Sequence, residues 1–259
     1  MLSRGYTFCM RLADVPIRVT VENLETKISC QNYMILDDAA TPAFSVTVTE
    51  QDRIREWKEL LQTGVHDPAY VNQLPGHYFE TCALHRLIAE QLLYHDTVMF
   101  HGSCVVMEGR AYIFTGKSGS GKSTHTSLWC RAFKEKAFIL NDDKPFLKLD
   151  GSRVMAFGSP WDGKSRKNRN TSAPVQGICI LEKDTSDHIR RTSLSEEFTA
   201  LTYQTFRPLE ERNFDRSVTL FRKIMSCIPL YRMGSTISLN APVVSWKAMQ
   251  NGENGHVNA

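Results

Sequence analysis

The 259-residue chain lacks paired cysteine motifs, long apolar runs and a strong net charge. Its seven cysteines include no Cys-x-x-Cys pair, which argues against a zinc site or a disulfide framework and for reduced thiols in the cytoplasm. No run approaches the ~18 apolar residues of a membrane span, and residues 1–19 do not resemble a signal peptide. A formal net charge of +3 favours neither nucleic acid nor a membrane surface as a partner.

What remains is an ordinary globular composition, with 42% hydrophobic and 23% charged residues, which can bury a core without disulfides or metals. Residues 1–95 carry alternating strand-like runs and two amphipathic helical patterns, at 52–63 and 79–95. We expect this part to be a β-rich, mostly antiparallel extension with linking helices. Residues 96–250 should form an α/β catalytic domain, and 251–259 a disordered tail.

The expected domain begins with a strand over 98–107, a turn at Glu108-Gly109 and a second strand over 111–115. A helix should follow at 124–132 and a short buried strand at 137–140. Further elements are expected as strands at 145–149, 154–157, 175–181 and 228–233 and as helices at 195–205 and 213–225.

The segment 116–123 has the sequence GKSGSGKS, which fits G-x-x-x-x-G-K-[ST] at every fixed position. Glycines allow several backbone N–H groups to face one phosphate, next to the positive end of a helix dipole. In such loops the lysine reaches the β- and γ-phosphates and the last hydroxyl ligates Mg²⁺. A plain turn is the alternative, but the strand-like run before the loop and the helical run after it favour phosphate binding. The nucleotide-contacting residues would be Gly116, Lys117, Ser118, Gly119, Ser120, Gly121, Lys122, Ser123 and Thr124.

Two acidic residues, Asp142 and Asp143, follow the apolar run at 137–140. A parallel strand after a crossover helix would end beside the strand that feeds the loop, so both carboxylates should lie near the phosphates. One could hold Mg²⁺ together with Ser123, and Asp142 is the candidate ligand; the other could accept a proton from an attacking hydroxyl. The sequence leaves this division of roles open. Turn residues ahead of Lys144-Pro145 are the alternative interpretation.

His101 is placed by the geometry of the expected hairpin. If the turn at Glu108-Gly109 has two residues, Met107 pairs with Arg110 and His101 lies opposite Gly116, at a separation of roughly 5 Å. An imidazole at the mouth of the loop could orient an aspartate or contact a phosphate. A purely structural histidine is the alternative, and a bulge would shift the register.

These elements together resemble the catalytic domain of the bacterial HPr kinase/phosphorylase family, which has His-Gly, a hairpin, a G-x-S-G-x-G-K-S loop and a strand that ends in Asp-Asp. The resemblance covers roughly residues 97–182, and the loop style is shared with phosphoenolpyruvate carboxykinases. It implies a P-loop kinase core with a mixed central sheet and flanking helices, ATP and Mg²⁺ as cofactors, and an aspartate of the pair as proton acceptor. It also implies Lys122 and Ser123 at the nucleotide and His101 in the active site.

Two departures point to a divergent stand-alone relative. Thr124 stands where the family usually has Glu, and the segment 158–164 (GSPWDGK) differs from the family signature. The basic run at 164–169 either faces a substrate or is a solvated loop, and Trp161 beside it is either a pocket wall or a core anchor.

The expected activity is therefore an ATP-dependent kinase that transfers the γ-phosphate to a hydroxyl, with that of a serine favoured, and His101, Lys122, Asp142 and Asp143 are the catalytic residues. The acceptor is a protein, peptide or small molecule of open identity, and a homo-oligomer is left open. One alternative is a nucleotide-binding regulator or ATPase with little transferase activity. Another is a nucleic-acid-dependent NTPase that uses the basic run.

Overall fold

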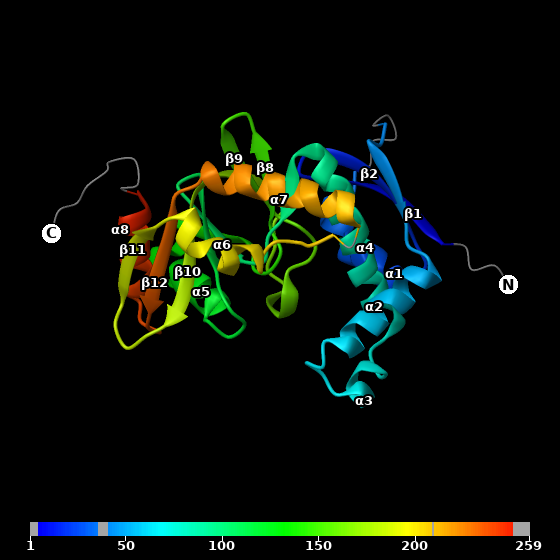
Figure 1. Cartoon of the computed structure of the whole chain (residues 1–259), viewed down its shortest axis with the longest axis horizontal. Coiled ribbons are helices and arrows are strands. Elements are labelled where there is room, and N and C mark those ends of the chain that lie inside the picture. Colours follow the sequence, from blue (N-terminus) through cyan, green and yellow to red (C-terminus); the bar gives the residue numbers. More distant parts are fainter. Residues whose placement is uncertain (1–4, 36–40, 209, 251–259) are drawn as a thin grey trace. The chain divides into compact units, whose positions relative to one another are not determined.

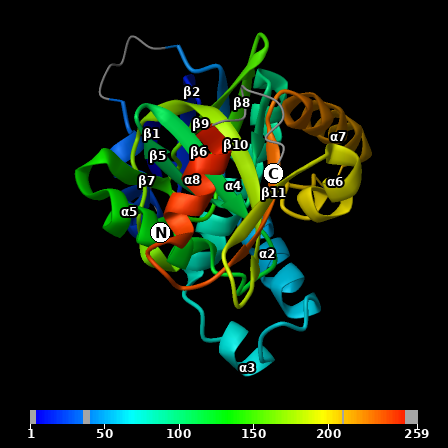
Figure 2. The same cartoon turned by 90° about the vertical axis from the view of Figure 1, so that its left-hand side faces the viewer.

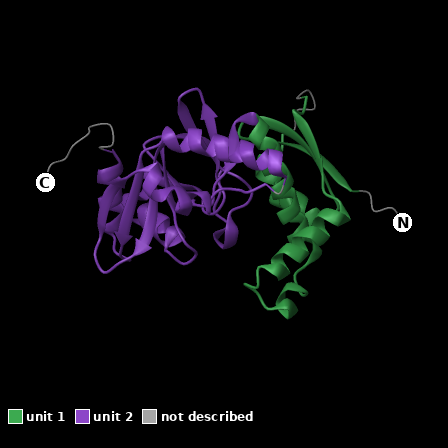
Figure 3. Ribbon diagram, viewed as in Figure 1, with its two compact units in different colours: residues 1–94 green, residues 95–259 purple. Residues whose placement is uncertain are grey.

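The computed structural model describes residues 5–35, 41–208 and 210–250 (Figures 1 and 2). The chain forms two compact units, Met1–Tyr94 and His95–Ala259 (Figure 3). The tail expected at 251–259 lies outside the described residues. Within the described ranges, none of the helices has both the length and the apolar character that a membrane crossing requires.

Unit 1 contains a three-stranded sheet in which β2 lies between β1 and β3. The alternation of β2 buries Ile17, Val19 and Val21 on one face, as its sequence pattern predicts. The β1–β2 pair is antiparallel as expected, but β2 and β3 are parallel, because the long connection between them allows a crossover. The elements are β1 (Tyr6–Leu12), β2 (Val15–Val21), α1 (Leu24–Ser29), η1 (Gln31–Tyr33), β3 (Phe44–Thr47), α2 (Glu50–Gln62), α3 (Pro68–Val71) and α4 (Gly76–Leu92), with the 3-10 turn η2 (Leu93–His95) after α4.

Polar contacts fix the helices of unit 1. Thr49 and Asp52 form a reciprocal capping box at the start of α2. Arg86 of α4 pairs with Asp52 at 3.1 Å and with Glu56 at 2.6 Å. The buried Glu80 accepts the backbone N–H of Glu22 at 2.7 Å, just before α1 begins. These contacts tie α2 and the segment that enters α1 to α4.

Unit 2 is built on a mixed sheet with the order β4-β8-β9-β10-β6-β5-β7, to which β12 is added on β10 and β11 on β12. Helix α5 packs against β5, β6 and β7, α8 packs against α5 and β10–β12, and α7 packs against β4 and β8. This confirms the expected mixed sheet with flanking helices. The elements are β4 (Thr97–Met99), β5 (Ser103–Met107), β6 (Arg110–Thr115), α5 (Lys122–Phe133), η3 (Lys134–Lys136), β7 (Ala137–Asn141), β8 (Phe146–Asp150), β9 (Arg153–Phe157), η4 (Gly163–Ser165), β10 (Ser172–Lys183), β11 (His188–Thr192), α6 (Leu194–Thr202), α7 (Glu211–Ser226), β12 (Leu230–Ser235) and α8 (Ala241–Gln250).

The β5–β6 hairpin has the predicted register, with Met107 opposite Arg110. The prediction of one continuous strand over 98–107 is wrong, because β4 pairs with β8 and β5 begins only at Ser103. Between them the backbone turns to a different partner: the N–H groups of Phe100 and Gly102 donate to the carbonyls at positions 145 and 143, at 3.0 and 2.9 Å. The segment 100–102 therefore continues the β4–β8 contact instead of the hairpin.

Strand β7 was expected beside the strand that feeds the loop, and this is wrong. β7 pairs with β5, which lies between β6 and β7. The hairpin partner β5 already occupies that edge of β6, so the chain returning from α5 adds to the outer edge of β5. Since β5 is antiparallel to both neighbours, β6 and β7 run in the same direction. Their carboxyl ends still meet at one edge of the sheet.

Candidate functional site

A glycine-rich loop connects the end of β6 to the first turn of α5. Gly116 has φ 137°, and a Cβ atom there would lie 2.7 Å from the carbonyl oxygen of Leu181, so a larger residue cannot occupy this position without strain. Gly121, which precedes α5, has φ 99°. The first N–H groups of α5 have no partners within the helix and lie at the positive end of its dipole. The first turn of α5 can therefore direct backbone N–H groups at an anion.

Lys122 is held over this loop by the loop's own backbone. Its Nζ donates to the carbonyl oxygen of Gly116 at 3.0 Å and to that of Lys117 at 3.3 Å. Burial lowers the pKa of Lys122, and the nearby carboxylates of Asp143 and Asp142 oppose this effect. In the described residues the buried hydroxyl of Ser120, which lies within the loop, has no hydrogen-bond partner.

Asp142 is buried, with 6% of its surface exposed. Its Oδ1 accepts hydrogen bonds from the hydroxyls of Ser103 and of Thr126, the latter at 3.4 Å. These two hydroxyls also contact each other at 2.7 Å. Strand β5 and helix α5 therefore fix this carboxylate in one orientation. Sequence reasoning missed both hydroxyls, although the hairpin register places Ser103 near the end of β6.

Asn141, which ends β7, shapes the turn that carries the second aspartate. Its Oδ1 accepts the backbone N–H groups of Asp143 at 2.9 Å and Lys144 at 2.6 Å, while its Nδ2 donates to the carbonyl oxygen of Ser159 at 2.9 Å. Asparagine commonly closes turns in this way. The turn is therefore made by Asn141, and the side chain of Asp143 remains available to the pocket.

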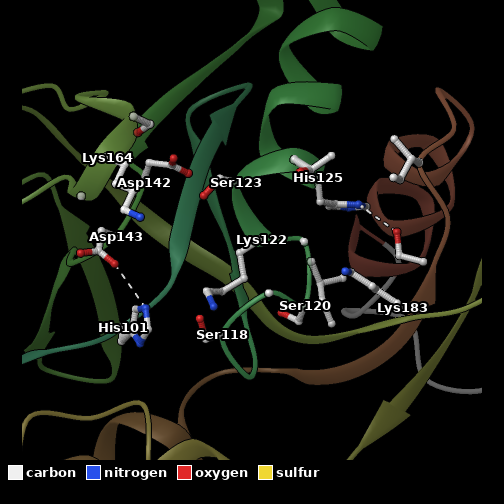
Figure 4. A pocket seen from close by; sticks show the side chains of 18 of the residues that line it. His101, Ser118, Ser120, Lys122, Ser123, His125, Asp142, Asp143, Lys164 and Lys183 are labelled. Atoms are coloured by element: carbon white, nitrogen blue, oxygen red, sulfur yellow. Dashed lines mark hydrogen bonds and ion pairs between the residues drawn. The ribbon is translucent and has the colours of Figure 1, made fainter. Parts of the chain in front are cut away.

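Asp143 forms a pair with His101, whose Nε2 lies 3.2 Å from Oδ1 (Figure 4). Lys144 Nζ lies 3.8 Å from Oδ2. Burial acts to raise the pKa of Asp143, but the hydrogen bond from His101 and the positive charges of Lys144 and Lys122 outweigh it, so that the pKa lies below its usual value. Asp143 is therefore an ionised acceptor at neutral pH.

The ladder pair predicted between His101 and Gly116 does not form. The backbone N–H of His101 donates to the carbonyl oxygen of Gln204 at 2.6 Å, and its carbonyl oxygen accepts from the hydroxyl of Thr115 at 2.8 Å. This correction follows from the break at 100–102. His101 nevertheless lines the same pocket as the loop, and its ring reaches Asp143 (Figure 4).

The loop and the acidic pair line one pocket of about 1090 Å³. His101, Asp143 and Lys164 lie toward one end of it and Lys183 toward the other, with Lys122 between them (Figure 4). Gly116 and Lys117 instead line an adjoining pocket of about 620 Å³. The predicted site residues in the larger pocket are His101, Ser118, Gly119, Ser120, Gly121, Lys122, Ser123, Thr124, Asp142 and Asp143.

The basic loop contributes to the pocket only in part. Lys164 lines the pocket, whereas the guanidinium of Arg169 lies over the ring of Phe138 at 4.3 Å. Trp161 is buried, with its ring 6.1 Å from that of Phe146. Trp161 is thus a core anchor of this loop.

A protein-only metal site is absent from the described residues, where no three His, Cys, Asp or Glu side chains are grouped suitably. Mg²⁺ does not require one, because it is commonly bound by one or two protein oxygens together with substrate phosphates and water. Ser123 and Asp142 both line the pocket, and the two side-chain hydrogen bonds to Asp142 go to Oδ1. These oxygen donors fit Mg²⁺ held jointly with a phosphate.

His125 lies in the buried wall between α5, α8 and β12. Its Nε2 accepts from Trp129 Nε1 at 3.2 Å and contacts the hydroxyl of Ser245 at 3.0 Å, while Nδ1 lies 3.3 Å from the hydroxyl of Ser235. Burial lowers the pKa of His125 from 6.5 to about 4, and only the charge of Asp187 opposes this. His125 is therefore neutral in the folded protein.

This burial predicts a loss of stability in acid. Protonation of His125 favours the unfolded chain, so its contribution is complete above pH 6.5 and is lost as the pH falls toward 4. The free energy of unfolding should fall between pH 7.5 and pH 5. We expect this fall to be about 2 kcal/mol smaller in His125→Gln than in the wild type. Denaturant titrations at both pH values measure this difference, and equal drops in the two proteins would contradict it.

No family model and no curated protein matches the chain. Among solved structures, the HPr(Ser) kinase/phosphatase from Coxiella burnetii is similar with a TM-score of 0.36 and 12% sequence identity, over 60% of this chain and 99% of that one. A likeness this distant assigns no activity to the chain.

Proposed function

We propose that the chain is an ATP-dependent phosphotransferase with a P-loop core of the HPr kinase type, which acts on a hydroxyl of a protein, peptide or small molecule in the cytoplasm. The observation that carries this proposal is that Lys122, with its glycine-rich loop, lines the same pocket as the His101–Asp143 pair. A regulatory nucleotide-binding site needs the loop but has no use for an ionised carboxylate paired with an imidazole.

The transfer step uses the chain's own residues. A carboxylate oxygen of Asp143 accepts the proton of the acceptor hydroxyl, whose oxygen forms a bond to the γ-phosphorus of ATP. The bond between that phosphorus and the bridging oxygen breaks, and ADP leaves with the electron pair. Lys122 and the N–H groups of the loop stabilise the charge on the phosphates. Mg²⁺, when bound, would neutralise further phosphate charge and orient the β- and γ-phosphates.

The environments of the two aspartates support different roles. Asp142 is buried and fixed through Oδ1 by Ser103 and Thr126, as suits a ligand of Mg²⁺ beside Ser123. Asp143 is more accessible, with 25% of its side chain exposed, and it pairs with the imidazole of His101. An acceptor from solution can therefore reach Asp143, which we assign as the proton acceptor.

The proposal is tested with purified full-length protein, Mg²⁺ and ATP labelled at the γ-phosphate. A host lysate, divided into macromolecules and small molecules, supplies the acceptors, and labelled products are identified by mass spectrometry. We expect label on a hydroxyl in one fraction. Binding of ATP with no transfer to either fraction would favour the regulatory alternative, and hydrolysis stimulated by nucleic acid would favour the NTPase.

A further inference from the structure

The pocket has two distinct ends, and the proposed function assigns a role to only one of them. At one end lie His101 and Asp143, where the proposed function places the acceptor hydroxyl and the γ-phosphate. The opposite end extends past α5 to Lys183, Thr185 and Ile237 (Figure 4 shows Lys183 on the far side of Lys122 from Asp143). The pocket continues from Asp143 past Lys122 to this second region, so a triphosphate on the loop with its γ-phosphate at Asp143 can extend its other end there.

Two turns build this second region, and Asp187 ties them together. Its Oδ1 accepts the backbone N–H of Thr236 at 2.7 Å, and its Oδ2 accepts the hydroxyl of Ser238 at 2.8 Å. The same Ser238 hydroxyl accepts the backbone N–H of Ala241 at 3.2 Å, at the start of α8. The turn after β10 therefore holds the turn after β12 in place, so this wall exists without a ligand.

The wall presents an apolar side chain to the solvent. Ile237 lines the pocket and is 81% exposed. Leu239, two residues further along the same turn, is 50% exposed and is not part of the pocket lining. Covering the face of Ile237 with a flat, largely apolar ring removes apolar surface from water, which favours binding.

We propose that this end of the pocket is the nucleoside subsite, with the base of the triphosphate packed against Ile237. The inference rests on the proposed function, since it needs a triphosphate on the loop. An apolar side chain contacts adenine and guanine alike, so packing against Ile237 does not distinguish the two purines.

The test compares ATP, GTP and inorganic tripolyphosphate, which has no nucleoside. Their affinities, with Mg²⁺, are measured by titration calorimetry for the wild type, Ile237→Ser and the matched control Leu239→Ser. Both substitutions are neutral and exposed, so neither changes the field at the phosphates or the core. We expect Ile237→Ser to weaken ATP and GTP about tenfold, equal to about 1.4 kcal/mol, and to leave tripolyphosphate unchanged. Leu239→Ser should change none of the three.

Each outcome separates the inference from the proposed function. If Ile237→Ser leaves ATP unaffected, or weakens ATP and tripolyphosphate alike, the nucleoside does not lie against this wall and the inference is overturned while phosphate binding stands. If the wild type binds neither ATP nor tripolyphosphate, the proposed function itself fails. A loss confined to ATP and GTP in Ile237→Ser supports the subsite.

Discussion

Asp143→Asn is expected to slow phosphoryl transfer by about 10²–10⁴-fold, the usual contribution of a general base, while ATP binding changes only a few-fold. In the wild type, His101 Nε2 lies 3.2 Å from Oδ1 of Asp143. The amide keeps the size of the side chain and this contact, but it cannot accept the proton of the acceptor hydroxyl. Rates under single-turnover conditions, combined with ATP affinity from calorimetry, separate the two effects.

Asp162→Asn is the matched control for this prediction. Asp162 lines the same end of the pocket and is also an aspartate, but its partner is the amide of Asn168, at 2.6 Å. We expect its replacement to alter transfer only a few-fold. Equal losses of transfer rate in the two variants would mean that transfer depends on the total negative charge of the pocket and not on one particular base. A wild-type rate in Asp143→Asn would remove Asp143 from the chemistry.

The sequence predicted the parts of this site that follow from local rules. A two-residue turn sets the β5–β6 register as far as Ser103. Beyond that point the expected register does not hold, because the N–H groups of Phe100, His101 and Gly102 donate to backbone carbonyls at 145, 204 and 143. These partners come from segments that lie far along the chain, and no periodicity in 98–107 indicates them.

The division of roles between the aspartates shows the same limit. Asp142 and Asp143 are adjacent and chemically identical in the sequence, so composition cannot distinguish them. Their difference comes from a hydroxyl pair, Ser103 and Thr126, on one side and from the ring of His101 on the other. The position of β7 was inferred wrongly for a related reason, because the local pattern does not say which sheet edge the hairpin has already occupied.

Lys122→Met is expected to lower kcat/KM for ATP by about 10²–10³-fold, comparable to the loss of one donor that stabilises developing charge. Methionine keeps the length of the apolar stem but removes the ammonium, which lies 3.0 Å from the carbonyl oxygen of Gly116. Lys117→Met is the matched control: its side chain is exposed and lies outside the larger pocket. It should change kcat/KM only a few-fold.

The stability of Lys122→Met distinguishes a functional lysine from a structural one. Burial lowers the pKa of Lys122, so the folded protein holds this ammonium at a cost, which an apolar replacement removes. We therefore expect the free energy of unfolding to stay equal or to rise, while activity is lost. A variant that loses activity and stability together would show instead that Lys122 holds the loop through its bonds to Gly116 and Lys117. Denaturant titration of both methionine variants, with and without ATP, decides between these outcomes.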